Sequence, residues 1–528
     1  MRMPRLLLKA ATAVVMICPT CLRAQSIQYP IQGTFLNFYR DLTPELWALE
    51  FQSMKAADIN TVIVVSVGRL EASSAQALSC SVGSRSYTDS SGYMLAPEGL
   101  LFPSNSISPA QRPTVDLLEM LLELADARGM NVYLGSLQTA TDWPDGSEFC
   151  ALRAYNQQVA SEILQRYGGH ASLKGWYFTQ ELWMNWVKYY GRTYYGTHLL
   201  AQWIADMKAL DATKLTTAAV VVKETGSGNM PGLTAAELQQ WTTSLLQTAK
   251  LDILMPQDGA GAGAGAPPLA DLAAYYGAMA AAVPAAGTKT SLWSTLETFT
   301  ASTDPNVSGE QYPPASDISR IESQVNNVRP YVSGYVSWMF GDDLSPQATY
   351  YPVEASELNR RYKYAFKSQS VPNDDVIPIQ SYSYPAQQPD SRYPDSASVP
   401  KLSDGTGGGY NGHSLITWVG FSDVNYQSTT AQIVADLGAT KTIHSVQALT
   451  QSWMASGIFH PSQMSVEVSQ DNVNWAPFGK TTSFPSDTQD FAVMWGEVDG
   501  SASARFVRWT FSYREWMFLA ELEVVGPQ

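Results

Sequence analysis

Residues 175–181, GWYFTQE, are typical of a short buried strand that carries an acidic side chain at its end. Segments with the apolar periodicity of amphipathic helices lie on both sides of this stretch, at 152–166 and 196–210. A buried strand between two such helices is the repeating unit of a parallel sheet with crossover helices.

The same unit recurs from residue 31 to about residue 365. Further strands are predicted at 33–39, 61–67, 131–137, 216–222, 253–255, 291–295 and 334–339. Further helices are predicted at 44–57, 114–128, 235–249, 268–283, 317–327 and 354–365. Eight β/α units over this length predict an α/β fold, the (β/α)₈ TIM barrel.

The first residues, MRMPRLLLKAATAVVMICPTCLRAQS, are typical of a secretory signal. Arg2, Arg5 and Lys9 precede an apolar run that ends at the small-residue site 22–24. We therefore expect cleavage near Gln25 and a secreted protein, extracellular or periplasmic. No other run approaches membrane-spanning length, so no transmembrane segment is expected.

After the barrel, Ser, Pro, Gln and Asp accumulate at about 368–387, which indicates a domain joint. Short alternating strands with turn signals follow, for example at 431–436, 464–468 and 506–511. The predicted organisation is a signal peptide at 1–24, a barrel at 25–366, a linker at 367–384 and an all-β sandwich at 385–528.

The charge and the cysteines limit the partners of the protein. The 528 residues carry 33 Lys and Arg against 48 Asp and Glu, a net charge of −15, so nucleic acid is not an expected partner. Cys80 and Cys150 follow the signal, and the sequence is compatible with a disulfide or with free thiols. The five histidines lack HxH or HExxH spacing, so no cofactor for catalysis is expected.

In a TIM barrel the functional side chains lie where strands end and βα loops begin. Glu181 ends the fourth predicted strand and Glu297 ends the seventh. Glycoside hydrolysis uses two carboxyl groups that flank the scissile bond, so these glutamates are the predicted catalytic pair. A separation of about 5–5.5 Å would retain the anomeric configuration and a wider one would invert it. The alternative is that each glutamate caps a helix or pairs with a nearby base.

Other polar and aromatic residues follow the ends of the same strands. Gln257 and Asp258 can hydrogen-bond sugar hydroxyls, and Asp258 is either a reserve catalytic acid or a turn residue. The glycine-rich tract 259–265 lacks the Lys-Ser/Thr ending of a phosphate loop and is expected to be a flexible βα loop. Because aromatic rings stack on sugars, the predicted substrate-binding set is Asn37, Tyr39, Arg69, Glu71, Gln138, Trp183, Gln257, Asp258 and Trp338.

The barrel resembles the family called domain of unknown function 4434, whose members are barrels akin to glycosidases. The stretches that carry the resemblance are GTFLN at 33–37, MKAADIN at 54–60, GWYF at 175–178, LDILMPQDG at 251–259 and LWSTLE at 292–297. The two glutamates also resemble those of clan A glycosidases, which implies Glu181 as acid/base and Glu297 as nucleophile. Gln180 stands where that clan usually has Asn.

Residues 385–528 resemble a coagulation factor 5/8 type C, or discoidin-like, module. The stretches are YPDSASVPKLSDG at 393–405, DLG at 436–438, VEVSQD at 466–471, ARFVR at 504–508 and LAELEV at 519–524. The resemblance implies a jelly-roll sandwich that binds glycans or lipids, with a structural calcium ion held by Asp404 and Glu521. The candidate ligand platform is Trp418, Trp453, His460 and Trp516.

The sequence therefore predicts a secreted glycoside hydrolase that acts on an extracellular polysaccharide or oligosaccharide and carries a carbohydrate-binding module. One alternative is a noncatalytic glycan-binding or adhesion protein in which the barrel is a scaffold. Another is a polysaccharide lyase, for which Arg69 is the only suitably placed uronate-binding residue.

Overall fold

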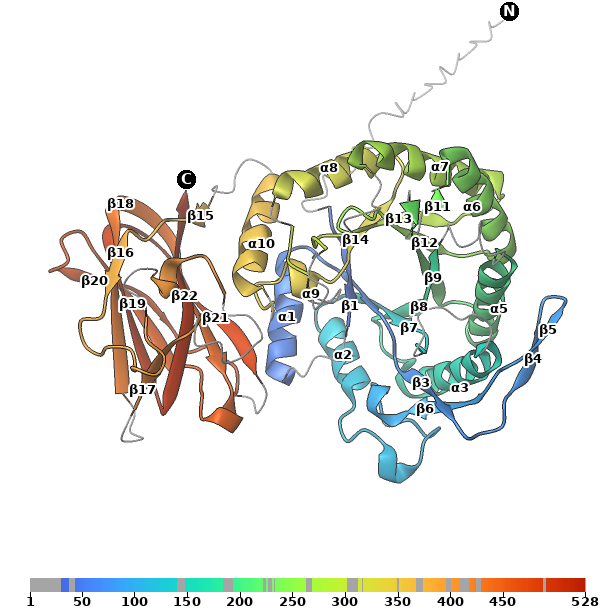
Figure 1. Ribbon diagram of the computed structural model, residues 1–528, viewed down its shortest axis with the longest axis horizontal. Helices are drawn as coiled ribbons and strands as arrows, with labels where there is room; N and C mark the ends of the chain where they lie inside the picture. Colours follow the sequence, from blue (N-terminus) through green and yellow to red (C-terminus); the bar gives the residue numbers. More distant parts are fainter. Residues whose placement is uncertain are drawn as a thin grey trace, which may run out of the picture.

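A computed structural model places the chain in a barrel and a β-sandwich (Figure 1). The structure describes residues 30–37, 43–139, 148–183, 193–221, 225–226, 230–231, 233–262, 268–301, 312–315, 317–348, 351–366, 374–395, 400–407, 417–423, 429–487 and 491–527. For residues 183, 193–196, 225–226 and 230–231 only the backbone is described.

Eight parallel strands close the barrel, and each is one of those expected from the sequence. In spatial order they are β1 (Gly33–Leu36), β14 (Gly334–Ser337), β13 (Ser291–Leu296), β12 (Ile253–Gln257), β9 (Leu215–Val221), β8 (Leu173–Trp183), β7 (Asn131–Gly135) and β2 (Thr61–Val64). The TIM-barrel prediction is therefore confirmed.

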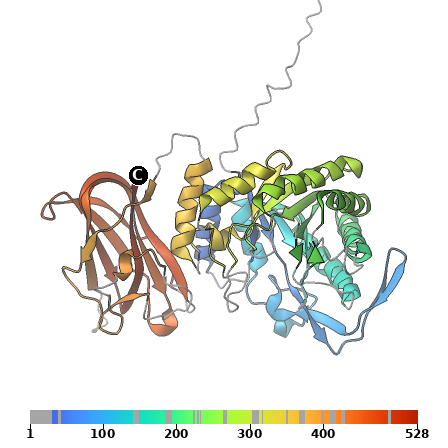
Figure 2. The ribbon, with the colours of Figure 1, turned by 45° about the horizontal axis from the view of Figure 1, so that its top comes forward.

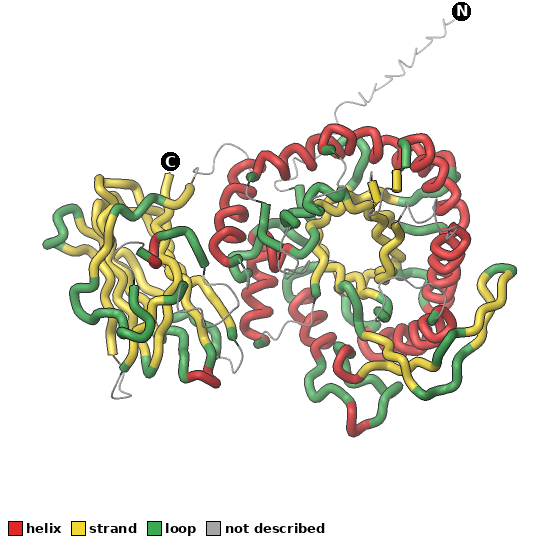
Figure 3. The backbone as a smooth tube through the Cα atoms, viewed as in Figure 1, coloured by secondary structure: helices red, strands yellow, loops and turns green. Residues whose placement is uncertain are grey.

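Helices surround the strands on the outside (Figure 3). They are α1 (Pro44–Ala56), α2 (Leu117–Asp126), α3 (Phe149–Tyr167), α5 (Thr193–Leu210), α6 (Ala235–Ala249), α7 (Leu272–Ala285), α8 (Ile318–Val328) and α10 (Pro352–Phe366). Local chemistry sets several helix starts: Thr234 and Glu237 form a reciprocal capping box on α6, and Thr43 accepts a hydrogen bond from Leu46 N at the start of α1.

Two hairpins after β2 were not predicted. β3 (Arg69–Ser73) pairs with β6 (Gly92–Ala96), and β4 (Ser79–Val82) pairs with β5 (Arg85–Thr88) in an arm that projects from the barrel (Figures 1 and 2). The residues of β4 and β5 are mostly exposed and polar, so they carry no apolar alternation to mark them as strands.

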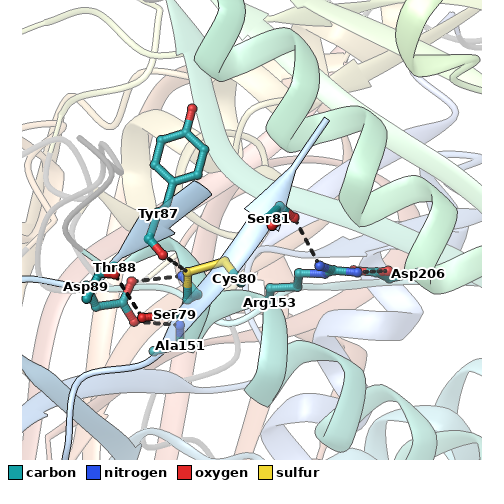
Figure 4. The surroundings of a disulfide bond; sticks show 10 residues. Ser79, Cys80, Ser81, Tyr87, Thr88, Asp89, Ala151, Arg153 and Asp206 are labelled. Atoms are coloured by element: carbon teal, nitrogen blue, oxygen red, sulfur yellow. Dashed lines mark hydrogen bonds and ion pairs between the residues drawn. A yellow bond between two sulfur atoms is a disulfide. The ribbon is translucent and has the colours of Figure 1, made fainter. Parts of the chain in front are cut away.

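A disulfide joins Cys80 of β4 to Cys150 of α3 (Figure 4). Beside it, the Asp89 carboxylate accepts hydrogen bonds from Cys150 N at 2.9 Å and Ala151 N at 2.8 Å, which caps the first turn of α3. Arg153 binds Ser81 O at 3.3 Å and Asp206 at 2.8 Å. The hairpin arm is therefore fixed to the helical layer by a disulfide and by hydrogen bonds.

The sandwich is a single antiparallel sheet that folds over itself. Its strands are β15 (Asp374–Val376), β16 (Ser381–Ser383), β17 (Val419–Ser422), β18 (Thr429–Ser452), β19 (Gln463–Ser469), β20 (Trp475–Thr481), β21 (Ala492–Tyr513) and β22 (Trp516–Pro527). β18 and β21 are long enough to run through both layers, with register shifts between Asp436 and Lys441 and between Ile443 and Ser445.

The linker prediction, 367–384, needs a correction. β15 pairs with β22 and β16 pairs with β18, so the sandwich has begun by Asp374. Both are edge strands of the sheet and are polar, as edge strands often are. Their composition resembled that of a linker for this reason.

Helix α10 packs against the sandwich. Val353 belongs to the same buried cluster as Trp418, Trp495 and Phe518, and Trp495 Nε1 donates a hydrogen bond to Pro352 O at 3.2 Å. Arg360 forms an ion pair with Glu523 at 2.9 Å, with side-chain exposures of 14% and 2%. The described residues of the two domains therefore meet at an apolar cluster with a buried ion pair beside it.

Two residues of the expected sandwich platform are not at the surface. Trp418 is buried in the cluster that includes Val353, and His460 is buried against Phe484, with ring centroids 6.2 Å apart. Both therefore stabilise the interior and cannot stack on a ligand. Within the described residues, no helix is long and apolar enough to cross a membrane.

Candidate active site

Glu181 lies near the end of β8, where the pairing with β9 shifts register between Phe178 and Leu182. Its Oε1 atom accepts a hydrogen bond of 3.0 Å from Nε2 of Gln257, the last residue of β12. The negative charge of Glu181 also adds to the effect of burial in raising the pKa of Tyr177. Glu181 therefore faces Gln257 across the intervening strand β9, and its side chain remains partly exposed.

Glu297 follows β13 and is 5% exposed. Its Oε2 atom accepts a hydrogen bond of 2.8 Å from Gly261 N, and its backbone N–H donates one of 3.2 Å to Asp258 Oδ1. Its carbonyl oxygen accepts hydrogen bonds from Arg320 Nη1 at 3.1 Å and Gln324 Nε2 at 3.2 Å, both on α8. The side chain and the backbone of Glu297 are thus both held by neighbouring loops.

Asp258 is fully buried, which the sequence did not predict. Oδ1 accepts hydrogen bonds from Ala260 N and Glu297 N, and Oδ2 accepts one of 2.6 Å from Gln324 Nε2. Burial raises the pKa of Asp258 to about 6, although these hydrogen bonds and Arg320 oppose the shift. A side chain without exposed surface cannot contact a sugar, so the prediction of direct substrate binding by Asp258 is wrong.

An acidic pair missed by the sequence reasoning lies beside this network. Asp342 and Asp343 are on α9 (Phe340–Asp343), directly after β14, and Thr298 Oγ1 donates a 2.8 Å hydrogen bond to Asp343 Oδ2. Burial, and to a lesser extent the charge of Asp342, raises the pKa of Asp343 well above its ordinary value. The only available signal was two acids in succession after the eighth strand.

Aromatic rings line the interior below the mouth. Trp338 follows β14 and is partly exposed, with its ring 5.0 Å from that of Phe35. Phe35 in turn lies 5.2 Å from the ring of Tyr177, which is near Glu181. Trp338, Phe35 and Tyr177 therefore form one aromatic cluster inside the barrel.

Of the remaining predicted residues, some are described by the structure and others are not. Asn37 is half-buried at the end of β1, and the carbonyl of Gln138 accepts a hydrogen bond of 2.8 Å from Leu70 N. Arg69 and Glu71 are exposed on β3 and form an ion pair with each other at 2.7 Å. Tyr39 lies outside the described residues, and only the backbone of Trp183 is described.

The side chain of Gln180 does not lie beside that of Glu181. Its Nε2 atom donates a hydrogen bond to Leu137 O at 3.3 Å, and the residue lines a cavity between β8, α3 and α5 with Phe178 and Trp203. The Gln180 side chain is therefore turned towards the helical layer, at the position where the sequence departs from the clan A pattern.

In the sandwich, Asp404 and Glu521 come together as expected. Glu521 is buried, accepts a hydrogen bond of 3.2 Å from Gly405 N, and has its pKa raised to about 9 by burial and by the charges of Glu523 and Asp404. Both carboxyl groups would offer oxygen atoms to a hard cation such as calcium. Across the described residues, no group of three or more His, Cys, Asp or Glu is placed to hold a metal ion.

Comparison with solved structures finds likenesses of low identity. A candidate α-L-fucosidase from Bacteroides thetaiotaomicron is 18% identical over 65% of this chain and 96% of that chain, with a TM-score of 0.49. Chitosan-binding module 1 of a Paenibacillus chitosanase/glucanase is 15% identical over 29% of this chain and 99% of that chain, with a TM-score of 0.20. The family 32 carbohydrate-binding module of Clostridium perfringens NanJ is 12% identical, covering 29% and 99%, with a TM-score of 0.21.

None of these likenesses identifies an activity. Among curated proteins, no match is found. The model of one protein family does match, over residues 31–350, which is more than half of the sequence and spans the barrel. The chain therefore belongs to the family described as domain of unknown function 4434 (DUF4434).

Proposed function

We propose that this protein is a secreted glycoside hydrolase in which Glu181 is the acid/base and Glu297 the nucleophile. One observation carries the proposal: Gln257 Nε2 donates a hydrogen bond to the Glu181 carboxylate, and the adjacent Asp258 accepts one from the backbone N–H of Glu297. Two glutamates from β8 and β13 are thereby linked to the same strand end, where an oxocarbenium-like transition state would need both carboxyl groups.

In this mechanism Glu181 protonates the leaving oxygen while Glu297 attacks the anomeric carbon. The Gly261 N–H donates a hydrogen bond to Glu297 Oε2 and so orients the attacking carboxylate. The Gln257 amide supports the ionised form of Glu181 after it has given up its proton. Glu181 then removes a proton from water, whose oxygen attacks the anomeric carbon and breaks its bond to Glu297, so the sugar leaves with retained configuration.

The sandwich supports the same proposal. We propose that it binds the polymer on which the barrel acts and that calcium bound at Asp404 and Glu521 stabilises its loops. Export would follow from the signal-like segment at residues 1–24.

The test is a screen of the purified protein on plant, algal and bacterial polysaccharides and oligosaccharides, with release of reducing ends as the readout. Release by the wild type and its loss in Glu297→Gln would support the proposal. Proton NMR of the first product formed would then distinguish retention from inversion.

One observation favours a second candidate, a noncatalytic glycan-binding protein. Glu297 is almost wholly buried and its carboxylate already binds a backbone N–H, as a structural residue would. Binding to a glycan by the wild type, with no release from any polymer, would support this alternative.

A further inference from the structure

We propose that Asp258 is a positioning residue that fixes the carboxylate of Glu297 through a reciprocal clamp with Gly261 and Gln324. This inference rests on the proposed function of Glu297. The clamp consists of the two strand ends after β12 and β13 together with helix α8, and its contacts are buried or partly buried.

Strand pairing brings the two loops to the same level. Gln257 is the register partner of Thr295, and Asp258 N donates a hydrogen bond of 3.0 Å to Thr295 O, one residue beyond the end of β12. Asp258 Oδ1 then accepts from Glu297 N, and Glu297 Oε2 accepts from Gly261 N. Each loop therefore supplies one carboxylate that binds a backbone N–H of the other loop.

The glycine-rich tract allows this close approach. Gly259 has a φ of +69°, which favours glycine. At Gly261 a Cβ atom would lie 2.4 Å from Phe299 O and 3.0 Å from the Cβ of Glu297. The carbonyl of Gly261 also accepts a hydrogen bond of 2.7 Å from Ala301 N. The beginning of the tract expected to be a flexible loop is therefore held against Glu297.

Helix α8 holds the clamp from behind. Arg320 and Gln324 are four residues apart, so both side chains lie on the same face of the helix. Gln324 Nε2 donates to Asp258 Oδ2 at 2.6 Å and to Glu297 O at 3.2 Å, while Arg320 Nη1 donates to Glu297 O at 3.1 Å. The Asp258 carboxylate thus accepts hydrogen bonds from three donors, which are Ala260 N, Glu297 N and Gln324 Nε2. Its role is to orient Glu297.

The polarity of the pair formed by Asp258 and Gln324 gives a direct test. In Asp258→Asn, an amide N–H₂ group would face the Gln324 N–H₂ group, so the contact at Oδ2 is lost. In Asp258→Asn/Gln324→Glu the donor and the acceptor are exchanged, which restores that contact. Asp317→Asn, at the exposed N-cap of the same helix, is the matched control because Asn caps as well as Asp.

Each full-length variant is measured in two ways. Hydrogen exchange with mass spectrometry follows the peptides that contain Gly261 and Glu297, and kcat and KM are measured on the substrate found in the screen. For Asp258→Asn we expect faster exchange at Gly261, which Asp258 does not bind, and a fall in kcat of about 100-fold with little change in KM. The double variant should recover part of the protection of Gly261 from exchange and part of kcat. The control should match the wild type in both measurements.

Unchanged Gly261 exchange and kcat in a folded Asp258→Asn variant would overturn the proposal, as would a double variant no better than the single one. If Asp258→Asn does not fold, Gln324→Met leaves Asp258 in place, removes the donor to Asp258 Oδ2 and to Glu297 O, and is measured in the same way. If the wild type hydrolyses no glycan, the proposed function fails, whereas exchange at Gly261 still decides whether Asp258 positions Glu297.

Discussion

The ion pair between Arg360 and Glu523 should be costly to break. At 2.9 Å and an effective dielectric constant of about 20, the attraction is about 6 kcal/mol. Desolvation opposes this attraction strongly enough to raise the pKa of Glu523 above its ordinary value. Removing one partner leaves the other buried and unpaired, so Glu523→Gln should lower the free energy of unfolding by about 3–5 kcal/mol. The midpoint of thermal unfolding should fall by roughly 10 °C.

Calorimetry and urea unfolding of the full-length protein measure this effect. The matched control is Glu357→Gln, which removes an i,i+4 pair with Arg361 on the same helix, with a distance of 3.3 Å and side-chain exposures of 30% and 39%. This exposed pair should contribute less than about 1 kcal/mol. The apolar exchange Arg360→Met/Glu523→Leu should recover most of the loss, because no charge is then left unpaired. Equal losses for Glu523→Gln and Glu357→Gln would refute the reasoning and the buried interface behind it.

Three further predictions concern other parts of the chain. Cys80→Ser/Cys150→Ser should lose about 4 kcal/mol of stability, because the disulfide closes a loop with a sequence separation of 70. An equal melting temperature of the wild type with and without reductant would contradict this. Burial lowers the pKa of His460 to about 3, so the unfolded chain binds a proton that the folded chain does not. Wild-type stability should therefore fall by up to about 5 kcal/mol between pH 6.5 and pH 3. Unfolding curves of His460→Gln, measured over the same pH range, should lack this contribution. Calcium should raise the melting temperature and a chelator should lower it, whereas Asp404→Asn/Glu521→Gln should respond to neither.

The sequence sufficed for the barrel because its signals are local and repeated. Barrel strands such as Ile253–Gln257 are buried on both faces, and α6 begins and ends where its capping box and apolar period indicated. The hairpin arm was missed because its strands are exposed and polar. The start of the sandwich was misplaced because β15 and β16 are held by distant strands and not by their own composition.

The candidate site was predictable only in part. Glu181 and Glu297 could be found because strand ends define the mouth of a barrel. Asp258 was assigned to substrate binding because the sequence does not show whether a loop carboxylate is exposed or buried. Arg320 and Gln324 were missed because their role arises from the packing of α8 against two loops distant in sequence, which leaves no local pattern.

The most direct test of the central claim compares the rate of glycan hydrolysis by Glu181→Gln and Glu297→Gln with that of the wild type. Glu123→Gln, on the exposed face of α2, is the control, and circular dichroism and a glycan-binding assay establish that each variant is folded and binds. We predict that both active-site variants lose at least about 1,000-fold in kcat while binding persists and the control is unaffected. Wild-type rates in either variant would contradict the assignment of Glu181 and Glu297 as the catalytic pair.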